Sequence, residues 1–328
     1  MHAQHSMLIR TPTASSTMAA LAPPATSAAA PWRAQFLQQL SRMPMPLCAV
    51  STLHPTDDGS PAAKPSTFPT IATPRVRSCV CRGLWGTLPE NAKNPAPRNP
   101  AVYESDLPVF TTDARMAKAW ELAASAPSGS TTAELGKAST NMTGGGGPIE
   151  AVWWASESGT QWRVRGTAWV LGPDVDDAAG EVARSAIQKY MRKAAPDSSS
   201  SSTASDWSWP REITAHFGNL SPGMRGSFRN PTPGLPRPRR GDEGNTKPGE
   251  GMGTPVGNDH LEDPEARANF RVVVIVPEEV DQVDLSKGDD PRRWVYTYVG
   301  EDRQHSKNPR LGEDVEIING WAKQEVWP

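Results

Sequence analysis

Residues 149–171 read IEAVWWASESGTQWRVRGTAWVL, and this stretch decides the fold. Two runs of alternating residues, 149–155 and 161–171, flank a turn at Ser158-Gly159. Alternation with a period of two is typical of strands that bury one face, and a short turn joins antiparallel neighbours. The stretch therefore predicts a β-hairpin, in which Gln161 and Arg163 share one face and Trp162 lies on the other.

Further strands are predicted at 47–53, near 75–84, at 270–276 and at 293–299. Helices are predicted from Pro31, over about 113–123 and 176–193, and briefly after Pro277. The total of five to seven strands, joined by turns and loops, favours a mainly β fold over a doubly wound sheet. No Gly-x-Gly-x-x-Gly follows a strand, and Gly144–Gly147 falls within a glycine-rich insert. We expect an antiparallel β-barrel with flanking helices.

The composition limits how much of the chain forms this core. Of 328 residues, 33 are proline and 27 are glycine. The sequence predicts a disordered tail at 1–30 and a single domain over 31–328, with low-complexity inserts at about 56–73, 124–147, 194–206 and 229–266. A net charge of −2 predicts no nucleic-acid or anionic membrane partner.

Cysteine usage and the N-terminus indicate the compartment. The chain has three cysteines without a C-x-x-C pair, which argues for a reducing compartment and against a metal site. Cys79 and Cys81 alternate with Ser78 and Val80 and predict one buried face of a strand. We expect a cytoplasmic protein. The alternative is a mitochondrial one, because residues 1–56 contain no Asp or Glu and are rich in Ser, Thr and Ala.

The segment FTTDARMAK, residues 110–118, lies between a predicted strand and a predicted helix. The first N–H groups of a helix lack partners, and the helix dipole is positive there, so such a place binds phosphate readily. Thr111 and Thr112 supply hydroxyl groups, and Arg115 and Lys118 supply positive charge. The alternative is an ordinary N-cap without a ligand.

Three other groups of polar residues are candidates for a ligand site. Arg77 and Arg82 are five positions apart on one strand, so they point to opposite faces. Gln161 both donates and accepts hydrogen bonds, which suits the polar edge of a heteroaromatic ring. Ser221 begins a helix that carries Arg225 one turn later, and a structural cap is the alternative there.

Two long phrases give a more specific indication, NPAPRNPAVYESDLPVFTTDAR at 94–115 and AHFGNLSPGMRGSF at 215–228. With these phrases the chain resembles the pyridoxamine 5′-phosphate oxidase-like family of FMN-binding split barrels, and it is most similar to a eukaryotic subgroup. The resemblance extends from Pro31 to Pro328, apart from the inserts. It implies an antiparallel split barrel that binds FMN, usually as a homodimer with flavin at the subunit interface.

The resemblance also implies a set of cofactor-binding residues. Arg77 and Arg82 hold the places of the family's Arg-x4-Lys motif, with Arg in place of Lys. Thr111, Thr112 and Lys118 correspond to its phosphate-binding segment, in which Met116 and Ala117 replace Ser and Arg, and Arg115 compensates for the missing cation. Gln161 matches the flavin-binding glutamine, and Ser221 and Arg225 fall near a further polar contact.

The chain departs from the classical enzymes in the substrate motifs. It contains neither the Tyr…Arg-Pro-x-x-Ser element nor the late Arg-x-His, because no histidine follows Arg292-Arg293-Trp294 in position. Two hypotheses follow. The chain is either an FMN-dependent oxidoreductase with an unknown small-molecule substrate and no assigned catalytic residue, or a flavin-binding or degenerate scaffold without turnover.

Overall fold

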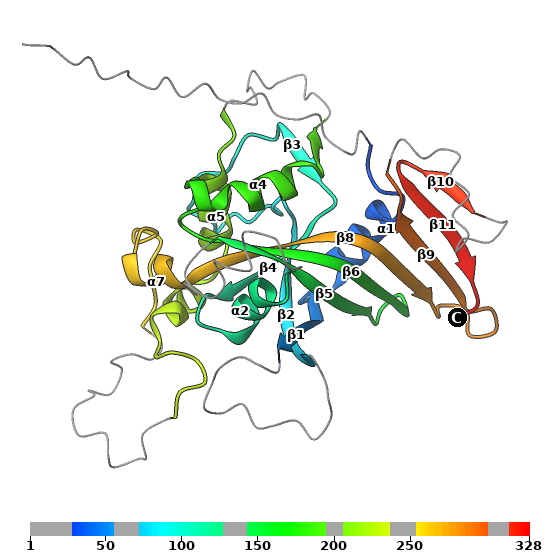
Figure 1. Cartoon of the computed structure of the whole chain (residues 1–328), viewed down its shortest axis with the longest axis horizontal. Helices are drawn as coiled ribbons and strands as arrows, with labels where there is room; N and C mark the ends of the chain where they lie inside the picture. Colours follow the sequence, from blue (N-terminus) through cyan, green and yellow to red (C-terminus); the bar gives the residue numbers. More distant parts are fainter. Residues whose placement is uncertain (1–27, 56–71, 127–142, 195–205, 237–253, 301–314) are drawn as a thin grey trace, which may run out of the picture.

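The computed structural model describes residues 28–55, 72–126, 143–194, 206–236, 254–300 and 315–328. These ranges contain eleven strands with helices on several sides (Figure 1). The strands are β1 (Leu47–Pro55), β2 (Ala72–Leu84), β3 (Tyr103–Ser105), β4 (Pro108–Asp113), β5 (Gly144–Ala155), β6 (Thr160–Leu171), β7 (Met191–Lys193), β8 (Phe270–Asp284), β9 (Arg292–Tyr298), β10 (Glu316–Ile318) and β11 (Trp321–Val326). The helices are α1 (Arg33–Arg42), α2 (Ala117–Ala124), α4 (Glu181–Gln188), α5 (Trp209–Gly218), α6 (Pro222–Gly226) and α7 (Pro264–Asn269), with 3₁₀ turns η1 (Ala178–Gly180) and η3 (Ser227–Arg229).

Six of these strands close into an antiparallel barrel. Their order is β8-β4-β2-β1-β5-β6, and β6 pairs again with β8. Closure leaves no free edge within the ring, so every strand has two hydrogen-bonded neighbours over part of its length. The prediction of an antiparallel barrel with flanking helices is confirmed. In addition, no helix among the described residues is long and apolar enough to cross a membrane.

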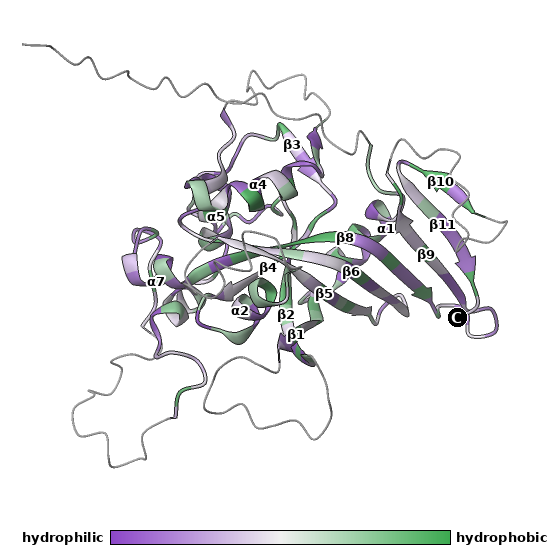
Figure 2. Ribbon diagram, in the orientation of Figure 1, coloured by the Kyte–Doolittle hydropathy of each residue, from purple (hydrophilic) through white to green (hydrophobic). Residues whose placement is uncertain are grey.

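The barrel splits along β8. Residues 270–274 pair with β4, whereas residues 279–284 pair with β9, and β6 follows the opposite edge of both halves. The first half is buried throughout, and Figure 2 shows its hydrophobic colour change to hydrophilic towards β9. The short helix predicted after Pro277 is therefore wrong. Pro277 lies opposite Gly166 at an irregularity of register, and the strand continues because its pairing with β6 runs on through this position.

Aromatic side chains from the predicted hairpin fill the barrel. Trp153 and Trp162 are opposite each other on β5 and β6 and are fully buried. Phe36 of α1 packs edge-on against both, at 5.2 and 5.5 Å between ring centroids. The alternation predicted for 149–171 is confirmed, as is the buried face formed by Cys79 and Cys81. Aromatic burial of this kind contributes strongly to core stability.

Several residues that were predicted to lie in inserts are part of the folded domain. Gly144–Gly147 belong to β5 rather than to an insert, and they pair with residues 168–170 of β6. Gly147 has no room for a side chain, because a Cβ there would lie 2.3 Å from the Leu122 carbonyl oxygen of α2. Residues 254–266 are also structured, with Val256 buried and α7 beginning at Pro264. Residues 1–27, 56–71, 127–142, 195–205 and 237–253 lie outside the described ranges, so the tail and inserts predicted there are not tested, whereas Ala30, which was predicted in the tail, is buried.

Other differences concern short elements. The helix predicted over 176–193 ends at Gln188, because 191–193 form β7 and pair with β3. Two strands that were not predicted, β10 and β11, follow β9 and extend the sheet beyond the barrel (Figure 1). Trp321 of β11 packs edge-on against Trp32 at 5.7 Å, which joins this extension to the barrel core.

Candidate functional site

Three of the predicted site residues converge at one end of the barrel, beneath α2. Thr112 is the penultimate residue of β4, and Lys118 lies in the first turn of α2, which packs against β1 and β5. The Lys118 Nζ donates to Thr112 Oγ1 at 3.1 Å and lies 3.0 Å from Met116 Sδ. Arg77 of β2 is near enough for its charge to act on Lys118. The barrel thus brings residues from β2, β4 and α2 to one place.

Lys118 is a buried cation without a counter-ion. Its side chain is 8% exposed, and it forms no ion pair with any carboxylate of the described residues. Burial lowers the pKa of this ammonium group; Cys79 opposes this most strongly, the nearby charge of Arg77 lowers the pKa further, and Glu121 and Asp113 oppose it less. Desolvating a charge without a partner costs free energy, which an anion bound here would recover.

The start of α2 offers a second contribution to anion binding. Its N-cap residue, Met116, makes no side-chain capping hydrogen bond, so the first N–H groups of the helix are not satisfied by a cap. These N–H groups and the positive end of the helix dipole favour negative charge. Lys118, Thr112 and this uncapped helix end together fit the phosphate group of a flavin mononucleotide.

Arg77, in contrast, already has an anionic partner. Its Nη2 lies 2.7 Å from Glu121 Oε2, and its Nη1 donates to Thr52 Oγ1 and, at 3.0 Å, to the Arg75 carbonyl oxygen. Glu121 is 1% exposed and also accepts from Thr52 Oγ1 and, at 3.0 Å, contacts His54 Nδ1. Burial alone would raise the pKa of Glu121, but the donors and the Arg77 charge lower it overall.

Glu121 was not predicted from the sequence as a site residue. The available signal was an acid on the buried face of the short helix AKAWELAA, where Lys118, Ala119 and Leu122 are also buried. A buried carboxylate is almost always paired, so such an acid points to a cation from another element.

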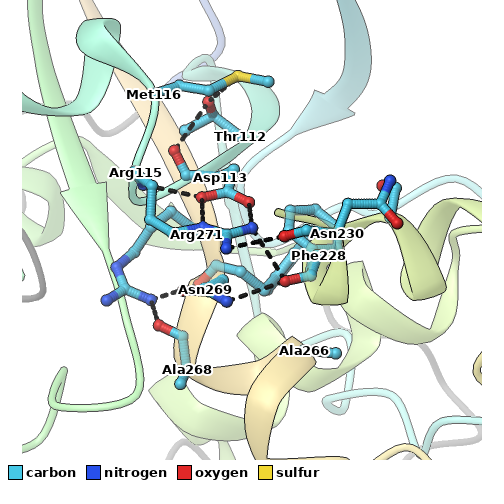
Figure 3. Close-up of polar contacts among 12 residues, drawn as sticks. Thr112, Asp113, Arg115, Met116, Phe228, Asn230, Ala266, Ala268, Asn269 and Arg271 are labelled. Carbon is cyan, nitrogen blue, oxygen red and sulfur yellow. Dashed lines mark hydrogen bonds and ion pairs between the residues drawn. The ribbon is translucent and has the colours of Figure 1, made fainter. Parts of the chain in front are cut away.

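Arg115 has a structural role that the sequence did not reveal. Figure 3 shows its guanidinium forked on Asp113, with Nε–Oδ1 at 2.9 Å and Nη2–Oδ2 at 2.7 Å. It also donates to the carbonyl oxygens of Asn230, at 2.9 Å, and Phe228, at 3.1 Å. The hydrogen bonds and charge of Asp113 raise the pKa of Arg115. With its donors used in this way, Arg115 does not compensate for the cation missing at Ala117, and that expectation is corrected.

Ser221 and Arg225 are likewise committed to the fold. Ser221 Oγ accepts from the Met224 N–H at 3.3 Å and caps α6, the structural alternative. Arg225 is fully buried and donates to the carbonyl oxygens of Gly218, Leu220 and Val256 and to Asn258 Oδ1. These contacts tie α5 to residues 256–258. Because none of its atoms reaches solvent, Arg225 is not placed to contact a cofactor.

Arg82 and Thr111 lie on the outer face of the barrel wall. As predicted, Arg82 faces away from Arg77, and it reaches Met224 Sδ at 3.9 Å. Its Nε is buried without a hydrogen-bond partner, and burial lowers its pKa. Thr111 is half-buried on the same side, because its neighbour Phe110 points into the barrel. This pair does not join the cluster around Lys118.

Gln161 lies on the opposite side of the barrel from Arg77. In the ring of six strands, β6 and β2 are three steps apart in either direction. Gln161 faces outward, since Trp162 next to it is buried in the core, and its amide has no hydrogen-bond partner among the described residues. Within one chain, Gln161 and Lys118 therefore do not form one site.

The histidine in the second phrase is sealed in the core. His216 lies beneath Trp85, with ring centroids 5.9 Å apart, and has no hydrogen-bond partner on either ring nitrogen. Complete burial lowers its pKa to about 3, with a smaller effect from Arg82. Glu212 one turn earlier is also buried, and desolvation raises its pKa. A neutral, inaccessible imidazole here packs against the aromatic cluster rather than exchanging protons with a ligand.

The fold and the site define an antiparallel barrel with a buried lysine and an uncapped helix start at one end. Residues 29–172 match the family described as pyridoxamine 5′-phosphate oxidase, FMN-binding domain. The family resemblance predicted from the sequence is therefore confirmed for this part of the chain, and the predicted cofactor, FMN, is that of the matched domain. Residues after 172 lie outside the match.

Two solved structures resemble the chain at low identity. One is a pyridoxamine 5′-phosphate oxidase-related, FMN-binding protein from Nostoc punctiforme PCC 73102, with 17% identity, a TM-score of 0.47, and coverage of 92% of this chain and 100% of that one. The other is PhzG from Burkholderia lata 383 in complex with tetrahydrophenazine-1-carboxylic acid, with 12% identity, a TM-score of 0.41, and 90% coverage of each chain. With TM-scores below 0.5, these likenesses carry no argument about this chain. No curated protein matches it.

Proposed function

We propose that the protein binds FMN as a redox cofactor and is an oxidoreductase, with the phosphate group held at the N-terminal end of α2. The observation that carries this proposal is the buried, uncompensated ammonium of Lys118 beside Thr112 and an uncapped helix end. Lys118 supplies charge, Thr112 orients that ammonium group, and the helix N–H groups complete the phosphate contacts. Bound FMN supplies the hydride chemistry, while the protein supplies binding and orientation.

A direct test separates the phosphate contact from contacts with the ring. We expect purified protein to retain the flavin absorbance bands after incubation with FMN and desalting. Riboflavin, which lacks the phosphate, should be retained much more weakly. The variant Lys118→Met should lose FMN retention but keep the wild-type circular dichroism spectrum. Failure of the wild-type protein to retain FMN would overturn the proposal.

We further propose that the protein works as a homodimer. Gln161 and Lys118 lie on opposite sides of one barrel, so a shared flavin requires Gln161 from a second copy. The outer face of β2, β1 and β5 is apolar and exposed, with Val76 at 72%, Trp154 at 49% and Leu47 at 45%. Large exposed apolar side chains on one sheet face are typical of an interaction surface. Sedimentation equilibrium tests this, and Trp154→Glu should yield monomers.

A second candidate is a flavin-binding scaffold without turnover. The observation in its favour is that Arg292 and Arg293 are paired with Glu325 and Asp281, so neither presents an unpaired charge to an anionic substrate. His216 is sealed as well. Loaded protein that is reduced by neither pyridoxine phosphates nor reduced nicotinamides would favour this candidate. Steady turnover with a physiological donor would exclude it.

A further inference from the structure

An acidic side chain lies beside the proposed phosphate site. The Glu121 carboxylate is buried on α2, one turn after Lys118, and receives donors from Thr52, His54 and Arg77. These donors come from β1 and β2, so Glu121 joins the helix to two strands of the barrel. The position of Arg77 is thus fixed within the chain, without any bound ligand.

This end of the barrel carries a negative charge as well as positive ones. Arg77 and Lys118 carry two positive charges, but Glu121 lies 2.7 Å from Arg77 and forms its ion pair. A carboxylate so close to the guanidinium reduces the charge that Arg77 presents to any other anion. It also repels an anion that approaches Lys118, because buried charges are only weakly screened.

We propose that Glu121 is a positioning residue that sets the affinity of this site for phosphate, because it holds Arg77 in place and competes with the phosphate group for its guanidinium. This inference rests on the proposed function, since the ligand is the phosphate group of FMN. It assigns the free cation, Lys118, to capture of the phosphate and the paired cation, Arg77, to control of its affinity.

The first test removes the charge of Glu121 with little change of shape. Glu121→Gln should tighten FMN binding about tenfold, because Arg77 no longer has a charged carboxylate partner and can donate to the phosphate group instead. Riboflavin affinity should not change, and inorganic phosphate should compete with FMN more strongly in the variant. Glu90→Gln removes the same charge at an exposed position remote from α2 and should change none of these values. Unchanged or weaker FMN binding by a folded Glu121→Gln protein would overturn the proposal.

A double-mutant cycle tests whether the effect passes through Arg77. In the background of Arg77→Met, the change Glu121→Gln should tighten FMN binding much less than it does in the wild-type background. Equal gains in both backgrounds would show that the two residues are not coupled at the site, and would overturn the proposal. A purely structural role for Glu121 would change the melting temperature without this coupling.

A measurement on the wild-type protein covers the case in which a variant does not fold. Saturating inorganic phosphate should shift the NMR signal of the Arg77 side-chain N–H groups, because the phosphate competes with Glu121 for them. An unchanged Arg77 signal at saturation would contradict the proposal. If the wild-type protein binds FMN but these tests fail, only the role of Glu121 is overturned. If neither the wild-type protein nor Glu121→Gln binds FMN or phosphate, the proposed function fails first.

Discussion

Arg115 and Lys118 are three positions apart at the start of one helix, yet the structure gives them opposite surroundings. Arg115 is forked on Asp113 and donates to two carbonyl oxygens (Figure 3). Lys118 is more deeply buried and has only a hydroxyl group and a thioether as partners among the described residues. Proximity in sequence therefore does not give two cations the same role. The role of each cation depends on whether the fold places a counter-ion beside it.

The largest expected effect follows from the removal of Arg115, the cation that has a counter-ion. Arg115→Met should lower the free energy of unfolding by about 3–5 kcal/mol, because Asp113 would stay buried without its partner. Chemical denaturation measures this loss. Arg165→Met, which breaks the more exposed pair with Glu279, should cost less than about 1 kcal/mol. A small loss for Arg115→Met would remove the structural role assigned to this residue.

Removal of Lys118 should have the opposite result, with a loss of FMN binding and no loss of stability. Lys118→Met should weaken FMN binding by about 10- to 100-fold, the usual range for a lost charge-assisted hydrogen bond. The free energy of unfolding should stay the same or rise, because a buried charge without a counter-ion is removed. Fluorescence titration and denaturation together test both statements. A destabilised variant that still binds FMN as tightly as the wild-type protein would make Lys118 resemble Arg115.

Removal of the Ser221 hydroxyl group, which caps a helix, should have a smaller effect. Ser221→Ala should lower the free energy of unfolding by about 1 kcal/mol, because the Met224 N–H loses its side-chain acceptor. FMN affinity should not change, since the Ser221 hydroxyl group is engaged in the cap of α6. Loss of FMN binding in this variant would restore the cofactor role that the sequence predicted for Ser221.

The smallest expected effect is a dependence of FMN affinity on pH, which titration of Lys118 would cause and Arg115 would not. The pKa of Lys118 lies below its usual 10.5, whereas that of Arg115 is raised. FMN binding requires the charged ammonium, so affinity should decline as pH rises through the lowered pKa, by about twofold where half of Lys118 is deprotonated. Isothermal titration between pH 7 and pH 10 measures this decline, which should be absent in Lys118→Met.

Linkage gives the matching change in stability. Between the lowered pKa of Lys118 and 10.5, the unfolded chain binds more protons at this residue than the folded one. The contribution of Lys118 to the free energy of unfolding therefore rises with pH in that window, and it is lost as pH falls through the lowered pKa. A contribution that fell with rising pH would mean that Lys118 gains a partner on folding.

Much of the barrel could be predicted from local pattern. The alternation in 149–171, the opposite faces of Arg77 and Arg82 and the buried pair Cys79 and Cys81 are all confirmed, because a strand's two faces follow directly from sequence parity. The prediction failed after Pro277, where an irregularity of register allowed a strand to continue through a residue that usually ends one. It also failed at Gly144–Gly147, which look like an insert but form part of β5 and pair with β6.

The candidate site was only partly predictable. Lys118 and Thr112 were found because a helix start after a strand has a local signature. Arg115 donates to the Asn230 carbonyl oxygen and Arg225 donates to the Val256 carbonyl oxygen. Each of these partners lies more than 30 positions away in the sequence. No local pattern encodes such partners. Glu121 was missed for the same reason, since its three donors lie on β1 and β2.

Most strands of the barrel, the helix that begins after FTTDAR and the family of the fold could be predicted from the sequence, because they depend on periodicity and on long continuous phrases. Only the tertiary structure decided which cations carry free charge. Ring closure places Arg77 beside Glu121 and Gln161 on the opposite wall, and Lys118 has no carboxylate partner in the described part of the chain. Electrostatic roles depend on distances of a few ångströms between separate elements, and chain folding alone sets those distances.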